Sequence, residues 1–435
     1  MKKKLLKCVE MLAIIVFLSN PTYVFADLED EEEIDVNSIA EEVIETSGTL
    51  TDEPSISSKI ALIYDRASGR ILYEKNGDEQ TPMASTTKIM TAIVAIENSN
   101  LDDTITIEST AEGTGGSRLG LKKGDKITVR DLLYGLMLRS GNDAAVALAI
   151  HISGSIEGFA NLMNEKAAEL ELINTHFVVP HGLDTDDHYT TAYELAKITD
   201  YALNIEELKD IVGTKSYTIT ISGKSKTISN TNELLGNLSG VYGVKTGFTN
   251  GAGRCLVTAC KRDELDIITV IIGADTKKER TTDSIKLIEY ANDNYEVINI
   301  KEKIEEEFKE WQNINQGRIV VNKAVESNIE LEFEQLEYEK MAIKSAQIDN
   351  IKIEINAIYY FEAPVEKGTV IGSIEIILED ETIEMLDIYS AKEMKKKDVI
   401  DYMKEFLKLA RMKKIKINLR KINLVKIRYK IQNCV

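Results

Sequence analysis

The chain has 435 residues, enough for two or three domains, and 43% of them are hydrophobic, so it can bury a sizeable core. Its 72 Asp and Glu outnumber 53 Lys and Arg, and the resulting net charge of −19 argues against a nucleic-acid partner. Four cysteines make a poor disulfide framework, and the four histidines form no cluster with metal-ligand spacing. We therefore expect neither a metal nor an organic cofactor.

The N-terminal segment reads as a secretory signal peptide over residues 1–26. A lysine-rich start precedes the apolar run Met11–Leu18, and Val24-Phe25-Ala26 resembles a cleavage site. The alternative, an uncleaved anchor, is disfavoured because the run is too short to span a bilayer. Residues 27–53 then hold 12 Asp and Glu and no Lys or Arg, which predicts a disordered acidic linker reaching about residue 58.

Residues 59–297 carry the patterns of a mixed α and β domain. The predicted strands are Ile60–Tyr64, Ile71–Glu74, Tyr217–Thr220, Lys226–Ile228, Cys255–Ala259 and Ile267–Ile272. The predicted helices are Thr86–Glu97, one begun by Thr128-x-x-Asp131, Ala144–Ile152, Ile156–Leu170 and Asp283–Tyr290. Strands at both ends with helices inserted between them predict an α+β fold, with one mainly antiparallel sheet flanked by helices. Cys255 and Cys260 lie at odd spacing on one strand, so we expect free thiols.

The sequence pattern changes after residue 297, and residues 298–390 predict a separate small β-rich domain. Glu302–Glu310 is a charged helix or linker. The short β-type runs that follow are Ile319–Val321, Ile329–Leu331, Ile351–Ile355, Val370–Ile371 and Ile374–Ile377.

The last segment, 391–435, is a basic tail with 15 Lys and Arg against 4 Asp and Glu, a net charge of +11. Apolar residues recur at helical spacing from Val399 through Met403 to Phe406, which predicts a basic amphipathic helix lying on an anionic membrane. Alternating apolar residues follow from Ile415 to Ile431. The alternative is that the tail packs against the acidic body of the same chain.

Three short motifs carry the chemistry of the first domain. Ser85 and Lys88 sit three residues apart at a predicted helix start, so their side chains share one face. A serine hydroxyl needs a base to become a nucleophile, and a desolvated lysine near other cations can serve. The helix start also offers backbone N–H groups to an oxyanion.

The second and third motifs are Ser140-Gly141-Asn142, on a predicted loop, and Lys245-Thr246-Gly247, on a predicted strand. Ser140 can relay a proton and Asn142 can hold a substrate amide. Lys245 and Thr246 can bind an anionic group, and Gly247 lets a substrate backbone lie against the strand. Each motif is weak alone, and the three together, in this order, are specific.

With these motifs, residues 59–294 resemble the serine-type D-alanyl-D-alanine carboxypeptidases, the low-molecular-mass penicillin-binding proteins of peptidase family S11. Further matching strings are Pro180-His181-Gly182-Leu183, His188-Tyr189-Thr190-Thr191-Ala192 and Gly251-Ala252-Gly253. The resemblance implies a β-lactamase/transpeptidase-like fold and removal of the terminal D-Ala from peptidoglycan stem peptides during cell-wall maturation. It also implies covalent inhibition by β-lactam antibiotics and an exported enzyme at the outer face of the cytoplasmic membrane.

The resemblance also implies a role for each motif residue. Ser85 would be acylated, Lys88 would be its base, and Ser140 would handle the leaving-group proton. The implied substrate-binding residues are Asn142, Lys245, Thr246, Gly247, Phe248 and Arg280. The backbone N–H groups of Ser85 and Phe248 would form the oxyanion hole. Arg280 can instead be a surface arginine, and we expect His181 and His151 to be structural.

Three rival functions remain open on the sequence. A β-lactamase on the same fold would need a deacylating Glu in a Glu-x-x-Leu-Asn run, which the sequence does not contain. A D,D-endopeptidase that cuts cross-links would use the same chemistry. A non-catalytic wall-binding or penicillin-sensing protein would have no use for the Ser85 and Lys88 pair.

Overall fold

The computed structural model describes residues 34–47 and 53–412. The chain forms two compact units, one ending at Val297 and the other beginning at Ile298, and each is described by itself. The predicted signal peptide, Cys8, Cys434 and the tail beyond Met412 lie outside the described residues.

A five-stranded antiparallel sheet forms the centre of the first unit. Its strands are β1 (Ile60–Asp65), β2 (Ile71–Lys75), β7 (Val241–Thr249), β8 (Gly253–Arg262) and β9 (Leu265–Ala274). Their order is β2-β1-β9-β8-β7, which places β7 at one edge. The predicted antiparallel sheet is confirmed. Cys255 and Cys260 are both buried and free, as expected.

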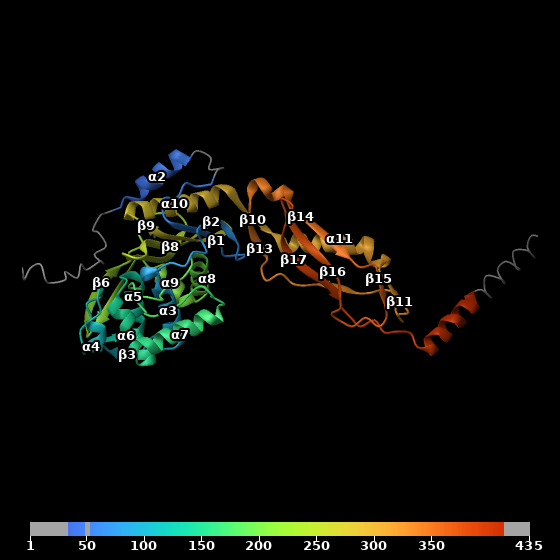
Figure 1. The fold of residues 1–435 in the computed structure, drawn as a ribbon, viewed down its shortest axis with the longest axis horizontal. Coiled ribbons are helices and arrows are strands. Elements are labelled where there is room, and N and C mark those ends of the chain that lie inside the picture. The colour runs from blue at the N-terminus through green and yellow to red at the C-terminus, as the bar shows by residue number, and fades with distance from the viewer. Residues whose placement is uncertain (1–33, 48–52, 413–435) are drawn as a thin grey trace, which may run out of the picture. The chain divides into compact units, whose positions relative to one another are not determined.

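Helices cover both faces of this sheet (Figure 1), so its central strands are buried on both sides. On one side lie α2 (Val36–Ser47) and α10 (Lys277–Asn294). On the other lie α3 (Lys88–Glu97), α5 (Val129–Leu138), α6 (Asn142–Ser153), α7 (Ile156–Glu169), α8 (Ala192–Leu203) and α9 (Glu206–Val212). Short elements join them: η1 (Ala84–Thr87), β3 (Thr104–Thr106), α4 (Ser109–Glu112), β4 (Lys126–Thr128), β5 (Ser216–Ile221) and β6 (Lys224–Ser229).

The predicted disordered linker is wrong for residues 36–47, which form helix α2. Val36, Ile39 and Val43 are buried, and the helix packs against α10. Their spacing of three and four residues places these apolar side chains on one helical face. That stripe gives the segment a surface to bury, which the acidic composition alone does not reveal.

The second unit is a β-rich domain with one long helix. The chain enters it through β10 (Tyr295–Asn299) and continues as α11 (Ile300–Asn315), so the charged segment is a helix. Strands β12 (Leu331–Phe333), β17 (Glu381–Ser390), β16 (Val370–Leu378) and β14 (Lys352–Ala357) form an antiparallel sheet in that order. The remaining elements are η2 (Gln316–Arg318), β11 (Val320–Asn322), β13 (Lys340–Lys344), η3 (Ser345–Asn350) and β15 (Tyr360–Glu362). Ile300, Ile304 and Phe308 of α11 join the core of this unit.

The first residues of the predicted tail belong to this β-rich unit. Met394 is buried and pairs with Val365, and Lys396 pairs with Ala324. The amphipathic helix itself covers 399–412 within the described residues. Among the described helices, none is by itself long and apolar enough to cross a membrane, and only α6 and α7 as a pair, bent by 85°, meet that measure.

Candidate active site

Ser85 and Lys88 meet where β7 passes the turn before α3. The Lys88 ammonium nitrogen Nζ lies 2.7 Å from Ser85 Oγ and 2.7 Å from the carbonyl oxygen of His181. Lys88 is fully buried, and Ser85 is 8% exposed. Ser85 lies in the 3₁₀ turn η1 and not at the start of the α-helix, because α3 begins at Lys88. The predicted pairing of nucleophile and lysine is present in the fold.

The loop that carries His181 is fixed to the nucleophile turn and to the sheet. Gly182 has φ of +83°, and a Cβ there would lie 1.9 Å from the carbonyl oxygen of Ala84, so only glycine fits. Thr91 Oγ1 donates to the Pro180 carbonyl at 2.6 Å. Asp184 accepts from Thr249 Oγ1 at 2.6 Å and from the Gly251 N–H at 2.9 Å. These contacts hold the His181 carbonyl in place as a hydrogen-bond acceptor for Lys88.

Two buried histidines in this region have neutral rings, which hydrogen-bond to the neighbouring backbone. Burial lowers the pKa of His181 to about 3, with a contribution from Lys88 whenever that side chain is charged, and His181 Nδ1 accepts from the Leu183 N–H at 3.2 Å. Burial also lowers the pKa of His188 to about 4. His188 Nδ1 accepts from the Val178 N–H, so Nε2 carries the proton that faces Thr87 Oγ1 at 2.9 Å. His181 is thus placed to hold its loop, and its structural role stays a prediction.

The second motif lies at the junction between α5 and α6. Ser140 is buried with φ of +59°, and Asn142 is the first residue of α6. Asn142 Nδ2 donates to the Gly115 carbonyl at 2.8 Å, while its buried Oδ1 has no hydrogen-bond partner among the described residues. A buried acceptor without a donor costs free energy, so this amide oxygen is a natural place for a donor from a ligand.

Asp143, which the sequence analysis did not select, orders the loop beside this motif. Its carboxylate accepts from the backbone N–H groups of Leu119, Gly120 and Leu121 at 2.9–3.0 Å. The same loop supplies the Gly115 carbonyl that holds Asn142. The signal in the sequence that points to Asp143 is its position directly after the Ser-Gly-Asn string.

The third motif lies on edge strand β7 beside Ser85. Lys245 and Thr246 are each 1% exposed, and Thr246 Oγ1 lies 2.7 Å from Thr231 Oγ1. A Cβ on Gly247 would lie 3.0 Å from the Ser85 backbone nitrogen. Gly247 therefore lets β7 approach the turn that carries Ser85, which is a different reason for glycine from the predicted substrate contact.

The two remaining site residues differ in their surroundings. Phe248 packs under the Arg254 guanidinium, whose carbon lies 4.7 Å from the ring centroid. Arg280 is 2% exposed and forms an ion pair with Glu233, whose Oε1 also accepts from Thr281 Oγ1 at 2.5 Å. Although burial raises the pKa of Glu233, Arg280 and the Thr281 bond lower it to below its usual value. The alternative of a surface arginine is therefore wrong.

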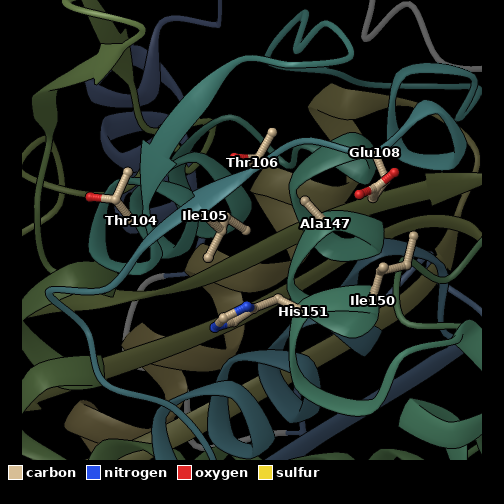
Figure 2. A pocket seen from close by; sticks show the side chains of 7 residues that line it. All are labelled: Thr104, Ile105, Thr106, Glu108, Ala147, Ile150 and His151. Carbon is tan, nitrogen blue, oxygen red and sulfur yellow. The ribbon is translucent and has the colours of Figure 1, made fainter.

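His151 does not pack in the core, contrary to the expectation that it is structural. Its side chain is exposed and lines a surface cavity of about 350 Å³ between α6 and β3 (Figure 2). The lining residues are Thr104, Ile105, Thr106, Glu108, Ala147, Ile150 and His151, none of which belongs to the three motifs. Within the described residues, no group of three or more His, Cys, Asp or Glu could hold a metal ion.

Comparison with known families gives two matches along the chain. Residues 47–276 match the D-alanyl-D-alanine carboxypeptidase family, and residues 308–396 match the C-terminal domain of penicillin-binding protein 5. DacF of Bacillus subtilis, a D-alanyl-D-alanine carboxypeptidase, is 33% identical over 363 residues, which cover 82% of this chain and 91% of DacF. DacA of Escherichia coli is 30% identical over 81% of this chain and 88% of its own length.

Solved structures agree with these matches. Penicillin-binding protein 5 from Haemophilus influenzae aligns with a TM-score of 0.67 and 27% identity, over 80% of this chain and all of that chain. The Streptomyces K15 DD-transpeptidase aligns with a TM-score of 0.53 and 35% identity, over 55% of this chain and 98% of that chain. The first alignment extends well beyond the length of the first unit alone.

Proposed function

This chain belongs to the D-alanyl-D-alanine carboxypeptidase family, and we propose that it removes the terminal D-Ala from peptidoglycan stem pentapeptides through an acyl-enzyme on Ser85. The observation that carries this proposal is the 2.7 Å contact between Ser85 Oγ and the buried Lys88 Nζ. Burial removes the water that stabilises an ammonium ion, which favours the neutral amine that base catalysis needs.

Acylation begins when Lys88 Nζ takes the Ser85 Oγ proton and Oγ attacks the carbonyl carbon of the penultimate D-Ala. The His181 carbonyl keeps the lysine in position during this transfer. The C–N bond of the tetrahedral intermediate then breaks, and the leaving amine receives a proton through Ser140. Water attacks the ester in the second step, and Ser85 recovers its proton as the shortened peptide leaves.

The developing oxyanion would lie between the backbone N–H groups of Ser85 and Phe248. Support for this comes from Gly247, which allows β7 to approach the Ser85 backbone nitrogen closely. Asn142 Oδ1, which is buried and has no partner in the part of the chain that the structure describes, would accept the substrate amide N–H. Lys245 and Thr246 would bind the terminal carboxylate, together with Arg280 if Glu233 releases it.

The contact between Glu233 and Arg280 favours a second candidate, a D,D-endopeptidase. A carboxylate of the chain already engages Arg280, which weakens the contribution of this arginine to binding a free substrate carboxylate. A cross-linked peptide whose leaving amine has no carboxylate beside it does not need this arginine, so its binding is not weakened when Glu233 engages Arg280.

β-Lactam antibiotics would acylate Ser85 and remain attached. The chain lacks the Glu-x-x-Leu-Asn run that a β-lactamase of this fold uses to hydrolyse the adduct. Intact-mass measurement over time distinguishes the two cases, because a stable adduct supports the carboxypeptidase and rapid loss of the adduct supports a β-lactamase.

Location follows from the substrate and from the tail. Peptidoglycan lies outside the cytoplasmic membrane, so the enzyme acts there after export. The helix over 399–412 exposes Val399, Met403 and Phe406 beside Lys404 and Lys408, which fits peripheral attachment to anionic lipid on the outer face of that membrane.

The deciding experiment measures free D-Ala released by the purified chain from a diacyl-D-Ala-D-Ala peptide. The wild type should release D-Ala, and Ser85→Ala should release none and take no label from a fluorescent penicillin, because the acyl group has no acceptor oxygen. Circular dichroism checks that the variant is folded. Labelling of Ser85→Ala at the wild-type rate would place the nucleophile elsewhere.

A further inference from the structure

The second unit exposes several apolar side chains on β11, on β15 and the two residues before it, and at the start of β16. We call this group the β11–β15 patch, and its members are the exposed residues Val320, Ile358, Tyr359, Tyr360 and Val370. Val320 and Tyr360 are register partners in the parallel pair of β11 and β15. The Ile358 N–H donates to the Ile371 carbonyl at 2.8 Å, which brings the start of β16 alongside.

These side chains are exposed although they lie next to the core of the unit. Tyr360 is 59% exposed, Ile358 56% and Val320 50%, whereas the neighbouring Ile371 is fully buried. Exposed apolar residues gathered on one edge, two of them tyrosines, are typical of a surface that contacts a partner or a membrane interface.

The amphipathic tail leaves the unit beside this patch. The Lys397 N–H donates to the Lys323 carbonyl at 2.7 Å, and the Val325 N–H donates to the Lys395 carbonyl at 2.9 Å. The segment 323–325 directly follows β11, so the patch and the root of the tail are neighbours. Figure 1 shows β11 and β15 close to the start of the terminal helix.

Basic residues border the patch on the side of the tail. Lys323, Lys395, Lys396 and Lys397 lie at the tail root, and Lys395 and Lys396 are exposed. Glu362 pairs with Lys323 and Glu405 with Lys397, and the tail over 391–435 carries a net charge of +11. Tyrosines and aliphatic side chains with a border of lysines match the headgroup region of an anionic bilayer in both polarity and charge.

We propose that the β11–β15 patch is a second membrane-contacting surface, which inserts into the headgroup region of an anionic bilayer next to the amphipathic tail. This inference rests on the tail attachment proposed above. One amphipathic segment binds lipid reversibly, and a second contact on the same molecule strengthens binding because the first holds it near the surface. Two contacts also fix how the second unit is oriented on the membrane.

Two kinds of full-length variant test the patch on vesicles of mixed phosphatidylglycerol and phosphatidylcholine. Tyr360→Trp reports the local environment, and Ile173→Trp, at an exposed site of the first unit, is its matched control. Both variants keep the native Trp311, so a difference between their emission shifts comes from the introduced tryptophan. We expect vesicles to shift Tyr360→Trp emission to the blue and brominated lipid to quench it, with neither effect at position 173.

Affinity is measured by co-sedimentation of Ile358→Ser/Tyr360→Ser against wild type. Burying one large apolar side chain corresponds to about tenfold or more in affinity, so this double variant should bind vesicles at least about tenfold more weakly. Met385→Ser is the control, because Met385 is 56% exposed and lies on β17 outside the patch. All variants should release D-Ala at the wild-type rate, which checks that they are folded.

The outcomes separate this inference from the proposals on which it rests. If wild type releases no D-Ala, the catalytic proposal fails, and if wild type ignores anionic vesicles, the tail attachment and the patch contact fail together. If wild type binds but Tyr360→Trp emission stays unchanged and the double variant binds equally well, the patch inference alone is overturned. The patch inference would also be overturned if the wild type self-associates without vesicles and the double variant does not. The partner of the patch would then be a second copy of the chain.

Discussion

Lys88 is held at two points, next to the hydroxyl that we propose as the nucleophile. Its Nζ lies 2.7 Å from both Ser85 Oγ and the His181 carbonyl, and the side chain is fully buried. Lys88→Arg keeps a positive charge but cannot give up a proton at neutral pH. We expect penicillin acylation to fall by about 10²–10⁴-fold, the usual contribution of a positioned base.

The measurement is the acylation rate with a fluorescent penicillin, and the thermal midpoint checks that the larger guanidinium is tolerated. Lys166→Arg is the control, because it makes the same substitution at a lysine that pairs with Glu97 and Glu169 and lies outside the three motifs. A near-wild-type rate for Lys88→Arg would mean that another group acts as the base.

The ion pair between Glu233 and Arg280 predicts that Glu233 limits the contribution of Arg280 to carboxylate binding. Glu233→Gln keeps an acceptor for Thr281 but removes the charge that engages the guanidinium. We expect the ratio of kcat/KM for a free-acid substrate to kcat/KM for its C-terminal amide to rise about tenfold, since a charge-assisted contact contributes about 1.5–3 kcal/mol. In the double variant Glu233→Gln/Arg280→Gln, this ratio should return toward the wild-type value.

Glu289→Gln is the control for this measurement, because it removes another ion pair of the same helix, with Arg262. If Glu233→Gln leaves the ratio unchanged, the buried pair is structural and Lys245 and Thr246 bind the carboxylate without Arg280. If the ratio falls, Glu233 supports Arg280 and does not compete with the substrate.

At the scale of elements, the loop that carries His181 makes the first unit sensitive to acid. His181 and His188 have pKa values of about 3 and 4 when folded, against 6.5 for an exposed histidine. Below pH 6.5 the unfolded chain binds protons that the folded chain does not, so stability falls as pH falls. Between pH 6.5 and 5 we expect about 2 kcal/mol lost for each histidine.

Urea unfolding of the wild type and of His188→Gln at pH 7 and pH 5 checks this expectation. The variant should be less stable at pH 7, because it disturbs the bonds to Val178 and Thr87, and less dependent on pH. Equal pH dependence in the two proteins would contradict the role given to His188.

Local patterns predicted the motifs and many of the elements, but not helices α8 and α9 or the contacts between distant segments. Thr128 caps α5 as its spacing with Asp131 indicated, because capping acts over three residues. Glu233 and Arg280 are 47 residues apart, and nothing local to either residue shows that they pair. Helix α2 was missed although Val36, Ile39 and Val43 form a helical stripe, because acidic composition was given more weight than periodicity.

At the scale of the whole molecule, the proposed membrane attachment and the proposed catalytic residues lie in different parts of the chain. Ser85, Ser140 and Lys245 belong to the first unit, and the amphipathic helix begins at 399. The sequence placed the start of the tail at 391, but Met394 is buried and residues up to Lys397 bond to the β-rich unit. A truncation that preserves the fold must therefore leave residue 397 in place.

Deleting residues 398–435 should release a fully active enzyme from anionic vesicles. The deletion removes the helix that exposes Val399, Met403 and Phe406, and each basic residue lost near an anionic surface removes about 1 kcal/mol of attraction. Binding of the full chain should weaken at high salt, because screening shortens the range of this attraction, but the apolar contribution should persist. Co-sedimentation with anionic and neutral vesicles at two salt concentrations measures both contributions.

The same truncation separates membrane attachment from the alternative that the basic tail packs on the acidic body. If the tail packs on the body, the full chain should ignore anionic vesicles, and deletion should lower the thermal midpoint because opposite charges are separated. If the tail is an anchor, deletion should abolish or greatly weaken vesicle binding and leave the midpoint unchanged. Residual salt-insensitive binding by the truncated chain is the result expected if the β11–β15 patch also contacts lipid, since its exposed side chains remain in place.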